Sequence, residues 1–289
     1  MPNRRARTED PVPDVRPFRA LRYESDVVGD LAAVVSPPYD LIDPTEAADL
    51  LNRHPKNAVR LDLPLGEQGD GPDDRYRRAA RTFAAWRSDG TFRKDPRPSL
   101  YVYEQERNGS NGPAGQGPRS VRRGFFGRLR LEPFGPGGGV EPREAPGSAQ
   151  REDRYKLLRA TGVNTSPIVV RLADPAGDAG QILAAVTNGS PDVDFSDTSG
   201  VHHRVWAVAA DGPDAEKVAS LLAAAGAGPV TIADGQARYE SALRYRDERR
   251  MSRSCEEDPA FDYILALFVD GSDADTQPPT GLVLNPHEW

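Results

Sequence analysis

Hydrophobic and polar positions follow two different periods along the chain, so the sequence predicts helices as well as strands. Between residues 73 and 88, large and small apolar side chains recur at helical spacing: Tyr76, Ala79, Ala80, Phe83 and Trp86. Asp43 stands in the position of an N-cap with Pro44 directly after it, which predicts a helix over residues 44–53. Further helices are predicted over residues 148–160, 178–186 and 213–225, and from residue 236 onward.

Strands are predicted where apolar or alternating runs are bounded by turn residues. These runs cover residues 31–35, 59–63, 99–105, 121–131, 166–172, 204–208, 263–269 and 281–284, with a short β-branched run at 231–232. A loop rich in Gly, Asn and Pro separates 99–105 from 121–131, which predicts a hairpin with a long loop. Helices and strands alternate without a regular βαβ repeat, so the predicted fold class is α+β.

Shifts in composition predict how the chain is divided. Residues 1–15 are rich in Pro and charge and are expected to form a disordered tail. Residues 135–139, GPGGG, are the strongest break, and they lack both a following Lys-Ser/Thr and GxGxxG spacing. A linker is therefore favoured over a phosphate cradle. We expect an N-terminal α/β lobe over residues 16–135 and a second module over residues 140–289.

Charge and composition narrow the classes of function. The net charge is −7, and arginine-rich islands occur without a continuous basic stripe, so no nucleic-acid partner is expected. Cys255 is the only cysteine and the four histidines lack a ligand spacing, which predicts neither a disulfide framework nor a zinc site and leaves any metal unknown. The chain shows no apolar run of a membrane span or signal peptide, so we expect no membrane partner and a cytoplasmic location. The pattern of apolar positions shows neither a heptad repeat nor a long exposed apolar helix, so it does not indicate an oligomeric state.

The most informative short stretch is TIADGQARYESAL, residues 231–243. It predicts a strand that turns at Gly235 into an amphipathic helix, with Asp234 before the turn and Arg238 after it. The N-terminus of a helix collects amide N–H groups and a positive dipole end, and anions are often bound there. A purely structural interpretation stays open, in which Asp234 caps the helix and Gly235 makes the turn.

Five strings along the chain occur together in the order found in a known family. They are VVSPPYDLI (34–42), HPKN (54–57), DRYKLL (153–158), NTSP (164–167) and IADGQARYESAL (232–243). With them the chain resembles the uncharacterised bacterial and archaeal family catalogued as domain of unknown function 1015, over most of residues 15–287. That family is similar to the ParB/sulfiredoxin-like nucleotide-binding fold and to archaeal free-serine kinases. The resemblance implies a mixed-sheet ParB/sulfiredoxin-like module at 140–289, with the N-terminal α/β lobe added to it.

The resemblance also implies roles for individual residues. Glu144 matches the Glu of a PHE tripeptide that acts as base on the substrate hydroxyl, and Asp234, Gly235 and Arg238 match a DGHHR string that holds nucleotide phosphates. Phosphoryl transfer needs clamped phosphates, a divalent ion and a carboxylate that takes the hydroxyl proton, so ATP or ADP with Mg²⁺ is the implied cofactor. An exposed loop carboxylate with no such role is the alternative interpretation of Glu144.

This chain departs from the family at the histidines. Gln236 and Ala237 replace the two histidines of the phosphate string, and Arg143 replaces the histidine of PHE. Gln236 retains hydrogen-bonding capacity and Arg143 adds a permanent positive charge near the phosphates, but none of the three titrates near neutral pH. The family pattern also continues well beyond the position matching residue 289. These departures favour a shortened, diverged member.

The sequence and the resemblance therefore predict two alternative functions. The first is a nucleotide-dependent kinase of a small hydroxylated metabolite such as free serine, with Tyr39 and Asp40 as candidates for the substrate pocket. The second is a catalytically degenerate member that binds nucleotide or acts as a regulatory or scaffold protein. A rigid Pro-Pro turn also explains the Tyr39-Asp40 motif without any ligand.

Overall fold

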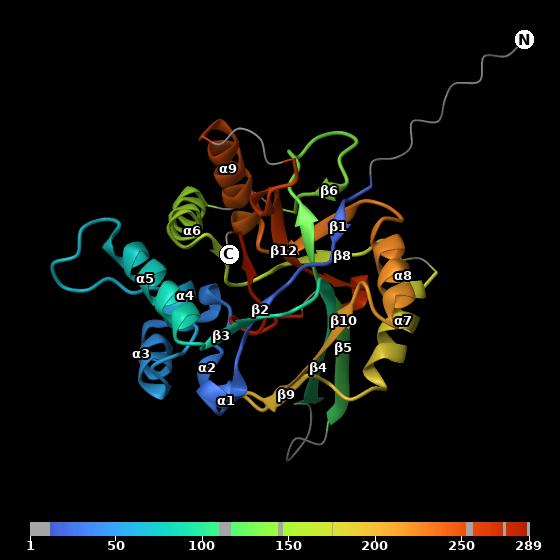
Figure 1. The fold of residues 1–289 in the computed structure, drawn as a ribbon, viewed down its shortest axis with the longest axis horizontal. Coiled ribbons are helices and arrows are strands. Elements are labelled where there is room, and N and C mark those ends of the chain that lie inside the picture. The colour runs from blue at the N-terminus through green and yellow to red at the C-terminus, as the bar shows by residue number, and fades with distance from the viewer. Residues whose placement is uncertain are drawn as a thin grey trace, which may run out of the picture.

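The computed structural model describes residues 12–109, 117–143, 147–174, 176–252, 257–273 and 276–287. Residues 1–11, Glu144 and Cys255 lie outside these ranges, and so does most of the predicted hairpin loop. The chain folds into an α+β structure in which helices surround a central mixed sheet (Figure 1). The α+β class predicted from the sequence is confirmed.

Within the described ranges, nine strands form one mixed sheet, and two short two-stranded ladders lie beside it. The large sheet has the order β6-β11-β8-β12-β5-β4-β10-β9, with β1 paired to β5. Its strands are β1 (Val15–Arg16), β4 (Ser99–Gly109), β5 (Gly117–Arg130), β6 (Val140–Glu141), β8 (Ile168–Arg171), β9 (Val193–Ser196), β10 (His202–Ala209), β11 (Val230–Asp234) and β12 (Tyr263–Val269). The small ladders pair β2 (Leu21–Tyr23) with β3 (Phe92–Lys94) and β7 (Val163–Asn164) with β13 (Asn285–Pro286).

Strand β12 lies at the centre of the sheet and is buried along its whole length. It runs parallel to β8 and antiparallel to β5, so it joins the two halves of the sheet. On β5, a Cβ at Gly124 would lie 2.5 Å from the carbonyl oxygen of Phe268. Glycine is needed there because any side chain would force the two strands apart.

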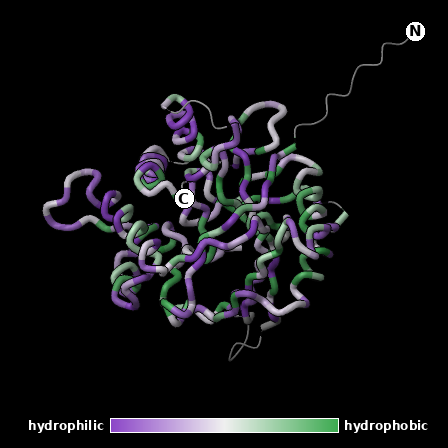
Figure 2. The backbone as a smooth tube through the Cα atoms, viewed as in Figure 1, coloured by the Kyte–Doolittle hydropathy of each residue, from purple (hydrophilic) through white to green (hydrophobic). Residues whose placement is uncertain are grey.

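Side chains from opposite faces of the sheet form two hydrophobic clusters. One cluster packs Val102, Phe125, Ile168 and Phe268 against four helices: α6 (Ser148–Thr161), α7 (Asp178–Thr187), α8 (Ala215–Ala225) and α9 (Gln236–Ser252). The other packs alternate residues of the same strands, such as Tyr103 and Leu267, against residues 18–20 and 282–283. Figure 2 shows the hydrophobic stretches gathered around the sheet and the hydrophilic ones along α6 and α9.

The helices predicted from periodicity are confirmed with small shifts at their ends. The helices are α1 (Ser25–Val28), α2 (Leu31–Val34), α3 (Pro44–Arg53), α4 (Val59–Asp62), α5 (Asp74–Ser88), α6 (Ser148–Thr161), α7 (Asp178–Thr187), α8 (Ala215–Ala225) and α9 (Gln236–Ser252), with 3-10 turns at η1 (Tyr39–Leu41), η2 (Ala260–Asp262) and η3 (Gly271–Asp273). The Asp43 carboxylate accepts hydrogen bonds from the amides of Thr45 and Glu46, as an N-cap does. This cap is the one that the sequence predicts for α3.

Three predicted strands are wrong. Residues 31–35 form the helix α2, because the Asp30 side chain accepts from the amide of Ala32 and starts a helical turn. Residues 59–63 form the helix α4, because the Asn57 side chain accepts from the amide of Val59. Residues 281–284 form a turn and bend, in which Leu284 forms an isolated bridge with Leu21 and the amide of Gly281 donates to the carbonyl of Thr165.

The sheet is continuous through the predicted domain boundary at 135–139. Strands β4 and β5 come before this boundary and β8 and β12 after it, and β5 pairs directly with β12. Gly139 packs closely on Pro13, where a Cβ would lie 2.7 Å from the proline nitrogen. Strands of both predicted lobes thus belong to one hydrogen-bonded sheet, and the division into two lobes stays a prediction.

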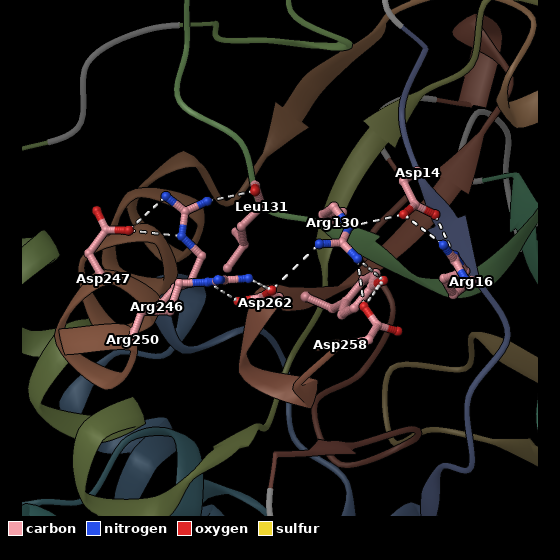
Figure 3. A network of polar contacts seen from close by, with 10 residues as sticks. Asp14, Arg16, Arg130, Leu131, Arg246, Asp247, Arg250, Asp258 and Asp262 are labelled. Atoms are coloured by element: carbon pink, nitrogen blue, oxygen red, sulfur yellow. Dashed lines mark hydrogen bonds and ion pairs between the residues drawn. The ribbon is translucent and has the colours of Figure 1, made fainter. Parts of the chain in front are cut away.

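A chain of ion pairs joins the N-terminal segment to the C-terminal half (Figure 3). Arg130 on β5 contacts Asp14 at 3.0 Å and Asp258 at 2.5 Å, and it reaches Asp262 at 3.5 Å. Arg250 on α9 donates to the same Asp262, whose side chain is 1% exposed. Because Asp262 is buried and doubly paired, it fixes the end of α9 to the sheet.

Candidate functional site

The junction between β11 and α9 has the backbone geometry that an anion site requires. β11 ends at Asp234, Gly235 has φ of +86°, and α9 begins at Gln236. A positive φ is unfavourable for residues with a side chain, so glycine is what lets the strand turn sharply into the helix. The first turn of a helix carries amide N–H groups with no intrahelical partner, at the positive end of the dipole.

The Arg238 side chain folds back over this turn. Its Nε and Nη2 atoms each lie 2.8 Å from where a Cβ of Gly235 would be. Nη2 donates to the Asp234 carboxylate at 2.8 Å, and the side chain is only 11% exposed. Among the described residues, none accepts a hydrogen bond from the buried Nε. The guanidinium therefore has an unused donor directly under the glycine turn.

Tyr39 lies near the guanidinium of Arg238 and near a second guanidinium, that of Arg154. The ring centroid of Tyr39 is 3.8 Å from Cζ of Arg154 and 5.6 Å from Cζ of Arg238. Burial raises the pKa of the Tyr39 phenol, against the opposing effect of the two positive charges. The phenol is neutral at physiological pH, and its oxygen accepts a hydrogen bond from Gln150 Nε2 at 2.7 Å. Both guanidinium groups therefore lie within cation–π distance of the Tyr39 ring.

Asp62 is the acceptor at the base of this site. Its Oδ1 accepts from Thr165 Oγ1 at 2.6 Å and from Arg154 Nη1 at 3.4 Å, and its Oδ2 accepts from Thr280 Oγ1 at 3.2 Å. Burial lowers the pKa of Arg154, but the carboxylates of Asp62 and Asp153 raise it by more. Arg154, Thr165, Asp62 and Arg238 line one small cavity of about 30 Å³.

The structure brings most of the predicted site residues to this junction. The amide of Arg143 donates to Gln236 Oε1 at 2.8 Å, and its Nη1 donates to the carbonyl of Ala233 at 2.9 Å. Gln236 in turn donates from Nε2 to Glu240 at 3.0 Å. Arg143, Asp234, Gly235, Gln236, Arg238 and Tyr39 therefore belong to one neighbourhood.

Two predicted residues are not placed at the site. Asp40 is exposed and does not line the cavity. Glu144 lies outside the described residues, directly after Arg143 in the chain. The catalytic role predicted for Glu144 stays a prediction.

Sequence reasoning assigned no role to Asp62, Arg154 or Thr165. Arg154 and Thr165 stand within the DRYKLL and NTSP strings, which carried the resemblance without an assigned function. Asp62 stands in the segment that was predicted as a strand. One sequence signal could have found Arg154 and Thr165. Their strings occur in the family together with the string at 232–243, although they are far from it in the chain.

A comparison with known protein families tests the resemblance that these strings carry. A family model described as protein of unknown function, DUF1015, matches residues 15–277. The chain belongs to the DUF1015 family. No curated protein and no solved structure gives a match. The predicted family is thus confirmed. In this DUF1015 protein, Tyr39, Arg154 and Thr165 come from three of the strings and lie around Arg238. Asn57 comes from a fourth string and binds the carbonyl of Val35, in the segment that leads to Tyr39.

Two kinds of feature are absent from the described residues. These residues contain no group of three or more His, Cys, Asp or Glu placed to hold a metal ion. None of the helices in the described ranges has the length and apolar character needed to cross a membrane.

Proposed function

We propose that the β11–α9 junction binds the phosphates of ATP or ADP with Mg²⁺, and that the protein is a nucleotide-dependent phosphotransferase acting on a small hydroxylated metabolite such as free serine. The observation that carries this proposal is the buried Nε–H of Arg238, which has no acceptor among the described residues and lies under the Gly235 turn. A phosphate oxygen at the helix N-terminus would accept from this donor and from the amides of the first turn.

The surroundings of Arg238 support the same chemistry. Asp234 is paired to Arg238 but its side chain is 43% exposed, so it can turn towards a divalent cation while a phosphate takes its place on the guanidinium. Arg154, which is paired with Asp62 and Asp153, adds a second guanidinium beside Tyr39. A ParB/sulfiredoxin-like arrangement of the module, as implied by the family resemblance, is part of this proposal.

The transfer step is assigned to Glu144. In the proposal, its carboxylate takes the proton of the acceptor hydroxyl as the oxygen attacks the terminal phosphorus, and the bond from that phosphorus to the nucleotide breaks. Arg143 is the residue directly before Glu144. Its contacts with Ala233 and Gln236 hold it at the β11–α9 junction. The chain therefore returns to the junction directly before this carboxylate.

A second candidate function is nucleotide binding without transfer, in a regulatory or scaffold protein. The side chain of Gln236 is engaged on both sides, by the Arg143 amide and by Glu240. Ala237 is buried and has no polar side-chain group. The two positions where the family has histidines thus supply no titratable group, which favours a site that binds phosphates and does not act on them.

Thermal unfolding with ATP, ADP or CTP plus magnesium tests the shared part of both functions. A ligand that binds only the folded state raises the melting temperature. Arg238→Ala is expected to reduce this rise through a loss of affinity of about tenfold, since it removes a charge-assisted hydrogen bond. Arg244→Ala is the matched control, because Arg244 lies on the same helix but pairs with Glu152 at the surface. Absence of a rise with every nucleotide at millimolar concentration would contradict both functions.

Glu144→Gln separates the two functions. If the protein is a phosphotransferase, this variant loses transfer to serine or a related hydroxyl compound, while nucleotide binding remains close to that of the original chain. Transfer measured with labelled ATP or ADP is the readout. Retained turnover in the variant would remove Glu144 as the base, and binding without any turnover in the original chain would favour the regulatory function.

A further inference from the structure

A second and larger cavity lies on the other side of the bridge between Ser36 and Thr280. These two residues exchange backbone hydrogen bonds of 3.3 and 2.8 Å, and Thr280 also contacts Asp62 of the site described above. The cavity has a volume of about 140 Å³. One water needs roughly 10–15 Å³ of such space, so there is room for a small organic molecule. Its lining shares no residue with the cavity at Arg238.

Two buried polar atoms of the lining have no partner in the described part of the chain. They are Oγ of Ser36 and Oε1 of Gln105, in residues that are 2% and 1% exposed. Buried polar atoms are nearly always hydrogen-bonded, because leaving them dry and unpaired is costly. Ser36 Oγ can donate or accept, whereas Gln105 Oε1 can only accept. A ligand that completes this pair must therefore carry an O–H or N–H group.

A chain of hydrogen bonds fixes another part of the lining, formed by His203, Asp197 and Ser199. His203 Nδ1 is 2.8 Å from the hydroxyl of Tyr103, and its Nε2 is 3.1 Å from Asp197 Oδ2. Asp197 also accepts from Ser199 Oγ at 2.7 Å. Because both ring nitrogens of His203 are engaged, its imidazole presents a fixed surface to the cavity.

Two guanidinium groups of the lining form no ion pair among the residues that the structure describes, although the carboxylates of Glu46 and Asp197 also line the cavity. Arg53 at the end of α3 and Arg107 on β4 are both exposed, and neither forms an ion pair with any described residue. Many of the other arginines of the described ranges are paired with carboxylates, such as Arg204 on β10 with Glu106 at 3.0 Å. Two unpaired guanidinium groups in one lining favour an anionic group on the ligand, and a carboxylate can accept hydrogen bonds from guanidinium groups.

We propose that this cavity binds a small carboxylic acid that carries a hydroxyl or ammonium group beside its carboxylate. The carboxylate pairs with Arg53 and Arg107, and the hydroxyl or ammonium group donates to Gln105 Oε1 beside Ser36 Oγ. The apolar side chains of Val35, Pro38 and Pro279 in the same lining accommodate a short carbon skeleton. The proposal does not depend on nucleotide binding, because it involves different residues.

Titration with four matched probes tests the ligand class. Lactate has the carboxylate and a hydroxyl, alanine has the carboxylate and an ammonium group, propionate lacks the donor, and propane-1,2-diol lacks the carboxylate. Calorimetry on the full chain without nucleotide is expected to show lactate or alanine binding about tenfold more tightly than propionate or the diol, the effect of one added hydrogen bond or charge pair. Equal binding of all four, or no binding at millimolar concentration, would overturn the proposal.

Substitutions in the lining test its location. Ser36→Ala is expected to keep or slightly raise stability, since it removes a buried Oγ that makes no hydrogen bond to a described residue, and to weaken binding of the preferred probe severalfold. Arg107→Ala is expected to bring the affinity for lactate or alanine close to that for the diol. The matched controls are Ser190→Ala and Arg171→Ala at exposed positions outside the cavity. If Ser36→Ala and Arg107→Ala bind the probes as tightly as the controls do, the cavity is not the site.

Discussion

Arg154 and Asp62 form an ion pair at 3.4 Å in which the side chains are 4% and 3% exposed. The pair joins α6 to the end of α4, which lies more than ninety residues earlier in the chain. Arg154 stacks on Tyr39, and Asp62 accepts from Thr165 and Thr280. This one contact therefore fixes the base of the candidate site.

We predict that Asp62→Ala lowers the free energy of unfolding by about 3 kcal/mol, because the buried Arg154 keeps only Asp153 as an ion-pair partner among the described residues and the hydroxyls of Thr165 and Thr280 lose their acceptor. Denaturant titration measures the change. Asp74→Ala is the control, since Asp74 pairs with Arg77 at the surface and its loss should be hardly detectable. Equal effects of the two substitutions would show that the Asp62 pair is not buried in solution.

Replacement of Gly235 tests the close approach of Arg238. Gly235→Ala places a Cβ at a positive φ and within 2.8 Å of the guanidinium, and should cost about 2–3 kcal/mol. Gly200→Ala is matched in φ, at +79°, but has no atom within 4 Å, so it should cost only about 1 kcal/mol. Thermal or chemical unfolding gives both values. Adding Arg238→Ala to Gly235→Ala should recover part of the difference, and no recovery would contradict the contact.

Asn57 holds the segment that leads to Tyr39. Its Nδ2 donates to the carbonyls of Ala33 and Val35 at 2.8 and 3.0 Å, and its Oδ1 accepts from the amide of Val59. Asn57→Ala should lower stability by about 2–3 kcal/mol, since buried backbone groups lose their partners. Asn52→Ala, at an exposed position of α3, should be close to neutral. Similar losses at both positions would contradict this role of Asn57.

His287 gives a prediction about pH. Burial lowers its pKa to about 3, with the charge of Arg249 as a further cause, whereas an unfolded histidine titrates near 6.5. Below pH 6.5 the unfolded chain therefore binds a proton that the folded chain does not, and stability falls as the pH decreases towards 3. Between pH 7 and pH 5 the loss from this residue should be about 2 kcal/mol.

The variant His287→Leu isolates this effect. It is expected to be less stable at neutral pH, since the hydrogen bond to Asn164 Oδ1 is lost, but to have a flatter dependence on pH between 7 and 5. Denaturant titrations at a series of pH values give the difference between the two curves. Parallel curves would mean that His287 is protonated with equal ease in both states.

Local sequence signals predicted the longer elements correctly because those elements carry their own start and stop residues. Asp43 and Pro44 define α3, and the apolar spacing defines α5. The failures at α2 and α4 concern helices of four residues, which are too short to show a period. Their conformation depends on single side-chain hydrogen bonds, from the N-cap Asp30 in α2 and from Asn57 before α4, which a pattern of apolar positions does not reveal.

The sequence by itself determined the turn at Gly235 and the order Asp234, Gly235, Arg238, because φ above zero and helix initiation are local properties of a few residues. It also determined the family, through strings that are separated along the chain. Only the tertiary structure decided that Tyr39, Asp62 and Arg154 meet Arg238. Their contacts arise from the packing of α6 against α9 and of the N-terminal segment onto both, and such contacts between distant residues form only when a common core is buried.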